Sequence, residues 1–123
     1  MKILFIGSDR EIVYMTSKIL KRNQYDVSVA VGHSEALNIL GCDSFDLVVF
    51  DCDMGVAERN SIIHQVKQQT DPPQLLVISE NREDEIILPE AGADDWVQKP
   101  YQMKVLLARM AALLRQKQQI KST

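Results

Sequence analysis

The chain has 123 residues, of which 46% are apolar and 25% are charged, and its formal net charge is -3. These values describe one compact soluble domain with a single core, and they leave no room for a second domain. The weak negative charge gives no reason to expect that this chain alone binds DNA or an anionic membrane. No run approaches the roughly 18 apolar residues of a membrane span, so we expect a cytoplasmic protein. Cys42 and Cys52 are too few for a disulfide framework and lack metal-ligand spacing.

Five short apolar runs, separated by stretches of helical character, recur along the chain. We predict strands at residues 2–6, 26–30, 46–50, 74–78 and 95–98. The helices between them would bury Ile12, Met15, Thr16, Ile19 and Leu20 in the first, Ala36, Leu37 and Leu40 in the second, Ile62, Ile63 and Val66 in the third, and Leu106, Met110, Leu113 and Leu114 in the fifth. The fourth helix, near 82–91, contains Pro89 and must be kinked, shortened or partly unwound unless it begins near Glu85 or later.

This alternation predicts an α/β fold of the doubly wound, flavodoxin-like (βα)5 type. The first, third and fourth strands are almost continuously apolar, as in a parallel sheet with helices on both faces. We therefore expect a five-stranded parallel sheet with strand order 2-1-3-4-5. The apolar pattern is lost in residues 115–123, so we place one domain at 1–116 and read 117–123 as a frayed helix end or a linker.

Chemically active residues follow three of the predicted strands. Asp51 comes at the end of the third strand, Ser79 at the end of the fourth, and Lys99 at the end of the fifth. Ligand and catalytic groups of doubly wound folds collect at the carboxyl ends of the strands. An acid, a hydroxyl and an ammonium group are therefore expected to converge on one pocket.

The segments around these residues form three blocks, FDLVVFDCDM (45–54), LLVISE (75–80) and GADDWVQKPY (92–101). Together they resemble the receiver domains of two-component response regulators, in the right order and spacing over residues 2 to 116. The resemblance implies that Asp51 is the phosphoacceptor, that Ser79 hydrogen-bonds the phosphoryl group and that Lys99 pairs with it. It also implies that Trp96 occupies the aromatic switch position, that the bond between Lys99 and Pro100 is cis, and that a histidine kinase is the partner.

The closing stretch, residues 99–115, resembles the last helix of the OmpR/PhoB-type subgroup. That resemblance implies a homodimer formed through the fourth helix, the fifth strand and the fifth helix. The charged positions of this face are Asp94, Asp95, Arg109 and Arg115. It also implies a transcriptional regulator that contacts DNA only through a C-terminal winged-helix domain, which is absent from this chain.

The sequence departs from the resembled family where the family binds Mg²⁺. The family places an acidic pair directly after the first strand, and the matching residues here are Gly7 and Ser8. Mg²⁺ requires oxygen ligands, usually carboxylates, so a metal would depend on Asp51 with Asp9 or Asp53. We expect Ser8 or Asp9 to cap the first helix instead, because residues 8–11 fit the S-x-x-E capping box. Without the acidic pair, Lys99 is free to bond Asp51 directly.

Two further departures concern the surroundings of this site. Glu80 stands at the pocket mouth, where it either hinders an anionic phosphodonor or points into water. Trp96 is larger than the usual Tyr or Phe, and it is fixed either inward as core packing or outward as an interface anchor.

Three hypotheses follow. The first is an atypical receiver without enzymatic activity of its own, which works by dimerisation or partner contact largely without phosphorylation. The second is a functional receiver, phosphorylated on Asp51, in which Asp9 or Asp53 supplies the missing charge. The third is a small flavodoxin-like enzyme or ligand-binding domain, which only the topology supports.

Overall fold

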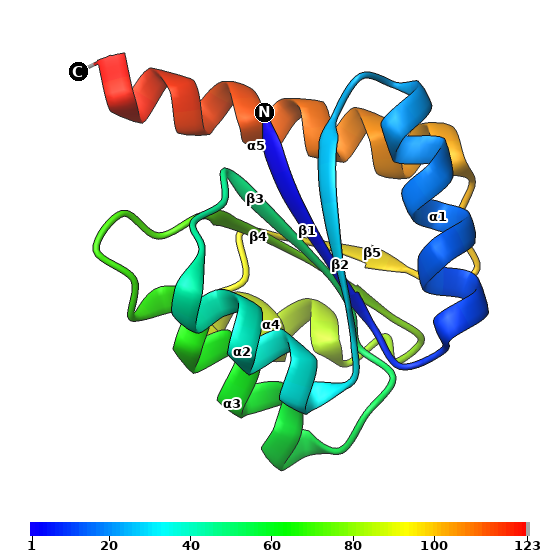
Figure 1. The fold of residues 1–123 in the computed structure, drawn as a ribbon. Helices are drawn as coiled ribbons and strands as arrows, with labels where there is room; N and C mark the ends of the chain where they lie inside the picture. Colours follow the sequence, from blue (N-terminus) through cyan, green and yellow to red (C-terminus); the bar gives the residue numbers. More distant parts are fainter. Residues whose placement is uncertain (123) are drawn as a thin grey trace.

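The computed structural model describes residues 1–122 as five strands and five helices that alternate along the chain (Figure 1). The elements are β1 Lys2–Gly7, α1 Arg10–Arg22, β2 Asp26–Val31, α2 His33–Cys42, β3 Leu47–Asp51, α3 Val56–Lys67, β4 Gln74–Ser79, α4 Asp84–Ala91, β5 Asp95–Gln98 and α5 Met103–Ser122. The strands form one parallel sheet in the order β2-β1-β3-β4-β5. The predicted fold class and strand order are confirmed.

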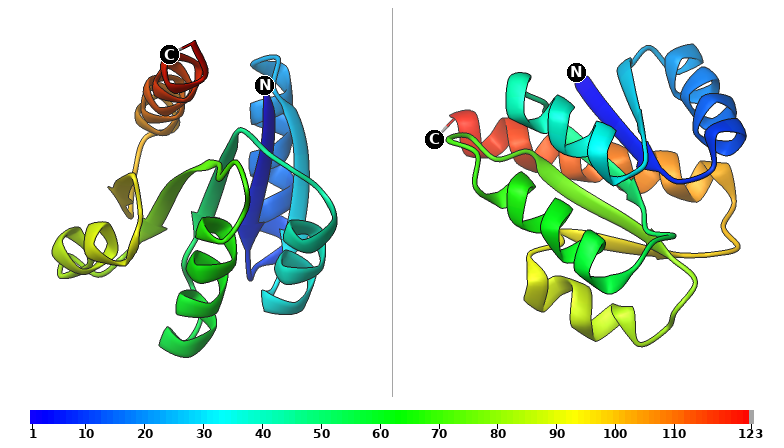
Figure 2. Two further views of the ribbon diagram at one scale, coloured as in Figure 1. Left: turned by 90° about the vertical axis from the view of Figure 1, so that its left-hand side faces the viewer. Right: turned by 60° about the horizontal axis from the view of Figure 1, so that its bottom comes forward.

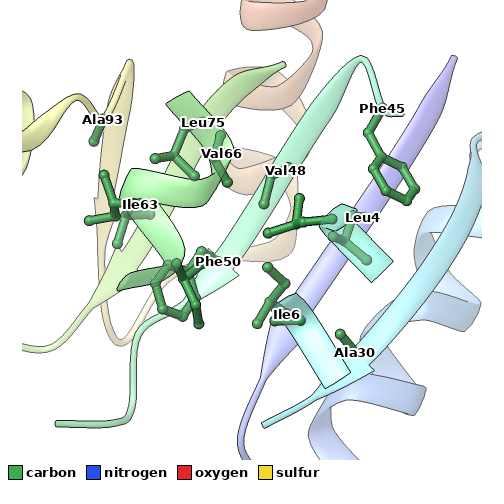
Figure 3. Close-up of a cluster of buried hydrophobic side chains, with 14 of the residues drawn as sticks. Leu4, Ile6, Ala30, Phe45, Val48, Phe50, Ile63, Val66, Leu75 and Ala93 are labelled. Atoms are coloured by element: carbon green, nitrogen blue, oxygen red, sulfur yellow. The ribbon is translucent and has the colours of Figure 1, made fainter. Parts of the chain in front are cut away.

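The helices cover both faces of the sheet. α1 and α5 lie on one face, while α2, α3 and α4 lie on the other (Figure 1). Each face has its own apolar core, and the core under α2, α3 and α4 is drawn in Figure 3, where Leu4, Ile6, Val48 and Phe50 from the strands meet Ile63 and Val66 of α3. Every residue of β3 and β4 is buried, which explains the continuous apolar runs.

The predicted buried faces hold for α3 and α5 but only in part for α1, where Thr16 and Leu20 are buried as predicted. Ile62, Ile63 and Val66 are buried in α3, and the four residues predicted for α5 are buried as well. In α1, however, Ile12 and Met15 are 44% and 60% exposed, and the buried residues are Val13, Thr16, Ser17 and Leu20. α1 is therefore rotated about its axis relative to the prediction. Ser17 can face the sheet because its hydroxyl donates to the carbonyl oxygen of Tyr14 at 2.8 Å.

α4 is short, as Pro89 requires. It has eight residues and contains this proline, which cannot donate a backbone hydrogen bond to the preceding turn. Its first turn is tight, because the N–H groups of Asp84, Glu85 and Ile86 each bond a carbonyl oxygen three residues earlier. The helix ends at Gly92, whose φ of 117° lies in the left-handed region that favours glycine.

α5 continues past the point where the sequence analysis expected fraying. It extends to Ser122, and Lys117 is only 3% exposed. Lys117 Nζ donates to Asp71 Oδ1 at 2.8 Å and to the carbonyl oxygen of Pro72 at 2.6 Å. The apolar pattern fails here because a buried polar anchor takes the place of an apolar side chain. The expected frayed end or linker is therefore helical up to Ser122, and residue 123 lies outside the described residues.

Candidate functional site

The carboxyl ends of neighbouring strands bring the predicted site residues to one edge of the sheet. Asp51 ends β3 and Ser79 ends β4, and across these strands Asp51 stands opposite Ile78. Lys99 directly follows β5, and its backbone N–H donates to the carbonyl oxygen of Ser79 at 2.9 Å. The peptide bond between Lys99 and Pro100 is cis, as the resemblance implied. The acid, the hydroxyl and the ammonium group thus lie at the carboxyl ends of three adjacent strands.

Asp51 and Lys99 form a direct ion pair. Lys99 Nζ lies 2.7 Å from Asp51 Oδ1, and the two side chains are 24% and 8% exposed, respectively. Burial raises the pKa of Asp51; Lys99 offsets this in part, while the charges of Asp53 and Glu80 raise the pKa further. Burial alone would lower the pKa of Lys99, but its close contact with the charged Asp51 carboxylate raises the pKa overall. This is the direct contact expected where Gly7 and Ser8 replace the acidic pair.

Ser79 takes part in a second polar network that the sequence analysis did not foresee. Its hydroxyl donates to Asp84 Oδ2 at 2.5 Å and accepts from the backbone N–H of Asn81 at 3.1 Å. The other oxygen of the same carboxylate, Asp84 Oδ1, lies 3.3 Å from Arg59 Nη1. The side chains of Arg59 and Asp84 are 12% and 6% exposed, so this second ion pair is largely withdrawn from water.

Gly7 ends β1 in a place where an added side chain would clash with Val13. A Cβ at this position would lie 2.6 Å from Val13 Cγ2 and 3.7 Å from Asp51 Cβ. Val13 is 1% exposed and belongs to the core between α1 and the sheet. Because that core is close-packed, Val13 has little room to retreat. A larger residue at position 7 therefore requires a rearrangement of α1 or a smaller residue at position 13.

Asp9 caps α1, and Ser8 bonds a neighbouring loop, which differs from a capping box that starts at Ser8. Asp9 is the N-cap of α1, and its Oδ1 accepts from the backbone N–H groups of Glu11 at 3.0 Å and Ile12 at 3.3 Å. Ser8 makes no cap; its hydroxyl donates to the carbonyl oxygen of Asp53 at 3.0 Å. The expected cap by Ser8 is therefore wrong and the alternative, Asp9, is right, because the helix begins one residue later.

The mouth of the site is open and is lined by charged, apolar and aromatic side chains. A cavity of about 670 Å³ is bordered by Asp51, Lys99, Glu80, Ile12 and Tyr101 among others. Asp53 and Glu80 are both exposed. Glu80 thus points to solvent beside the mouth, and it acts on Asp51 through its charge.

Trp96 lies on β5 and is partly buried. Its side chain packs against the core under α2, α3 and α4. Its Nε1 is buried, and no hydrogen-bond acceptor for it is found among the described residues. The indole also borders a cavity of about 690 Å³ on the outer edge of the sheet.

That cavity is a groove between α4, β5 and α5, which Figure 2 shows gathered at one edge of the molecule. Pro89 comes from α4, Trp96 from β5, and Tyr101, Val105 and Arg109 from the stretch around α5. Burial raises the pKa of Tyr101, and the charge of Asp51 raises it further.

The four charged residues predicted for this face do not all meet. Arg109 Nη1 donates to both oxygens of Asp95, at 3.1 and 3.2 Å, within the chain. Asp94 instead accepts from the backbone N–H of Leu75 at 2.7 Å and from Lys67 of α3 at 3.1 Å. Arg115 is exposed on α5.

Comparison with known proteins decides the family. Residues 3–111 match the response regulator receiver domain. The chain belongs to this receiver domain family. The receiver is 33% identical to the response regulator MprA of Mycolicibacterium vanbaalenii over 116 residues, which are 93% of this chain and 50% of MprA. It is 31% identical to the transcriptional regulatory protein CpxR of Escherichia coli over 115 residues, 93% of this chain and 49% of CpxR. The chain thus spans about half the length of the curated relatives it matches.

Solved receiver structures share the fold. The response regulator receiver domain from Methanospirillum hungatei superposes with a TM-score of 0.85 at 23% identity, over 96% of each chain. The receiver domain of the Francisella response regulator 1452 superposes with a TM-score of 0.83 at 24% identity, over 94% of this chain and 97% of that one. At this level of identity the likeness concerns the fold.

The residues of this receiver do not fit the magnesium site that its family implies. Gly7 offers no ligand and has no room for one, while the Asp9 carboxylate is engaged as the helix cap. Asp51 is already paired with Lys99. No group of three or more His, Cys, Asp or Glu side chains suited to a metal ion occurs within the described part of the chain. Likewise, none of the described helices has the length and apolar character needed to cross a bilayer.

Arg59 and Asp84 are the site residues that sequence reasoning missed. They lie 25 positions apart, and each stands on a helix where a charged side chain normally faces water. Only the contact of Asp84 with Ser79 had a local sequence signal, because the two residues are five positions apart across a turn. Nothing in the sequence indicated that Arg59 would reach them from α3.

Proposed function

We propose that this chain is the receiver of a response regulator in which magnesium-dependent phosphorylation of Asp51 is impaired, and that it acts through dimerisation or partner contact. The observation that carries the proposal is the pairing of Asp51 with Lys99 beside a position 7 that Val13 closes to side chains. We infer that the module regulates rather than catalyses.

The electrostatics of phosphoryl transfer support this proposal. An attacking carboxylate needs the charge on the transferring oxygens to be neutralised, which falls to metal ions and a lysine or arginine. Here Lys99 neutralises Asp51 itself, and the side chains that would attract Mg²⁺ are missing at positions 7 and 8. The exposed Asp53 and Glu80 add negative charge near the mouth, which disfavours the approach of an anionic phosphodonor.

The proposed partners draw on the names of the relatives and on the groove beside β5. MprA and CpxR are named as a response regulator and a transcriptional regulatory protein, and we propose that this receiver also controls transcription, with DNA contact made outside the present chain. We propose a homodimer through the groove between α4, β5 and α5, where Trp96 and Val105 offer apolar contact. A histidine kinase is the proposed upstream partner.

Phosphorylation is tested directly by incubating the chain with Mg²⁺ and acetyl phosphate and measuring the intact mass. We expect little or no acid-stable, base-labile adduct, since no metal assists the transfer. The Asp51→Asn variant is the control for modification elsewhere. Stoichiometric modification of the unaltered chain, absent from the variant, would overturn the proposal.

A second candidate is a functional phosphoacceptor, favoured by the convergence of Asp51, Ser79 and Lys99. In that case Asp53, which lies near enough to raise the pKa of Asp51, supplies the charge for a weak metal site. Trp96 is the only tryptophan, so a magnesium titration followed by its fluorescence distinguishes the two candidates. Saturable quenching that disappears in Asp53→Asn supports the second, and an unchanged signal supports the first.

A further inference from the structure

The network of Arg59, Asp84 and Ser79 joins three elements beside the site. Arg59 projects from α3, Asp84 is the first residue of α4, and Ser79 ends β4. The two oxygens of one buried carboxylate serve different partners, Oδ1 facing Arg59 Nη1 and Oδ2 accepting from the Ser79 hydroxyl. The same three residues border a cavity of about 200 Å³ that Lys99 and Cys52 also line. The network is therefore in contact with the site around Asp51.

The Ser79 hydroxyl is fully occupied as a donor. A serine hydroxyl carries a single hydrogen, and here it is given to a carboxylate, which forms stronger hydrogen bonds than a neutral acceptor. Any other oxyanion that needs this hydrogen has to compete with Asp84. Asp84 in turn is held by Arg59, so the competition is against an ion pair and not against a loose side chain.

α4 depends on the same network for its position. Only Asp84 and Leu88 of this helix are buried, while Ile86 and Ile87 are 71% and 44% exposed. The helix has no side-chain cap at its N-terminus and contains Pro89. Without the contacts of Asp84, Leu88 would be the only buried side chain that packs α4 against the rest of the domain. Elements with so few buried contacts open locally at low free-energy cost.

We propose that Arg59, Asp84 and Ser79 form a latch that fixes α4 against α3 and withholds the Ser79 hydrogen from Asp51, so that α4 shifts only when this network is broken. A partner that pulls on α4 therefore has to break the ion pair of Arg59 and Asp84 before the helix can move. This inference depends on the proposed function only for the identity of the partner that breaks the network.

Hydrogen–deuterium exchange of the intact chain tests the latch without Mg²⁺ or a phosphodonor. Asp84→Asn keeps the shape of the side chain but removes the charge that Arg59 pairs with. We expect exchange over residues 79–91 to become at least about tenfold faster, since removing one partner of a buried ion pair is costly, while β1 and β3 keep their protection. Asp43→Asn is the matched control, because it alters an exposed ion pair with Lys2 elsewhere in the chain and should change nothing in α4.

Two results would overturn the latch. One is exchange over residues 79–91 as slow in folded Asp84→Asn as in the parent; the other is an equal acceleration throughout the sheet, which indicates global destabilisation. If Asp84→Asn does not fold, Ser79→Ala replaces it, since it removes only one bond and should accelerate the same segment to a smaller extent. Phosphorylation of Asp51 in the separate mass measurement would contradict the proposed function and leave this outcome unaffected.

Discussion

At the scale of single residues, the packing of Gly7 against Val13 controls which side chains can stand next to Asp51. The distance of 2.6 Å from a Cβ at position 7 to Val13 Cγ2 is shorter than real carbon contacts allow. Whether a carboxylate can be introduced here is therefore a question of packing before it is one of charge.

The clash predicts a specific failure of additivity. Gly7→Ala should lower the free energy of unfolding by about 1–3 kcal/mol, as overpacking does. Val13→Ala makes room, so the double variant should lose clearly less than the sum of the single losses. Urea denaturation measures all three. Gly41→Ala, where nothing lies within 4 Å of the added Cβ, is the control and should gain roughly 0.5–1 kcal/mol as a helical Gly→Ala change. Strict additivity at positions 7 and 13 would contradict the clash.

The buried carboxylate of Asp51 predicts a pH dependence. Its pKa is raised in the folded chain, so its contribution to stability is fully present below the ordinary carboxyl pKa and is lost as the pH rises through the folded pKa. Asp51→Asn should therefore match the parent near about pH 4 and be the more stable of the two at neutral pH, because it removes a buried carboxylate. The pKa of Lys99 is raised as well, so its contribution persists through this window.

Urea denaturation of the parent and of Asp51→Asn at several pH values measures this difference. A variant that is less stable than the parent at neutral pH would mean that the ion pair outweighs the burial of Asp51.

At the scale of elements, α5 is anchored by a lysine where its apolar stripe ends. Lys117 is buried and bonds Asp71 and the carbonyl oxygen of Pro72, which ties the helix to the loop before β4. Lys117→Met keeps most of the volume and leaves the carbonyl without this donor. We expect a loss of about 1–3 kcal/mol in the free energy of unfolding, measured by thermal or urea denaturation. Lys104→Met, on the exposed side of α5, should stay within about 0.5 kcal/mol of the parent.

The sequence allowed the elements to be predicted better than the contacts between them. The strands were recognisable because buried parallel strands are continuously apolar, and the meeting of Asp51 with Lys99 followed from their places at strand ends. The rotation of α1 escaped prediction because Ser17, a polar residue, is buried in place of Ile12 or Met15. The partnership of Arg59 with Asp84 escaped because it depends on how α3 and α4 dock, which no local pattern encodes.

At the scale of the whole molecule, the groove between α4, β5 and α5 is the proposed contact with a second copy. Val105 is 38% exposed at this groove, and a charge there would have to be buried on association. Val105→Glu should weaken self-association by roughly tenfold or more, measured by analytical ultracentrifugation over a range of concentrations. Met15→Glu, on the exposed face of α1, should associate like the parent. A parent chain that stays monomeric at high concentration would contradict the proposed dimer.

The contact between Gly7 and Val13 also has an evolutionary consequence. An acidic residue introduced at position 7 while valine stands at position 13 clashes with that valine and lowers the stability of the domain. A smaller residue at position 13 has to appear beforehand, and by itself it opens a gap in the core. In either order of substitution, the path toward a carboxylate at this strand end therefore passes through a less stable variant of this chain.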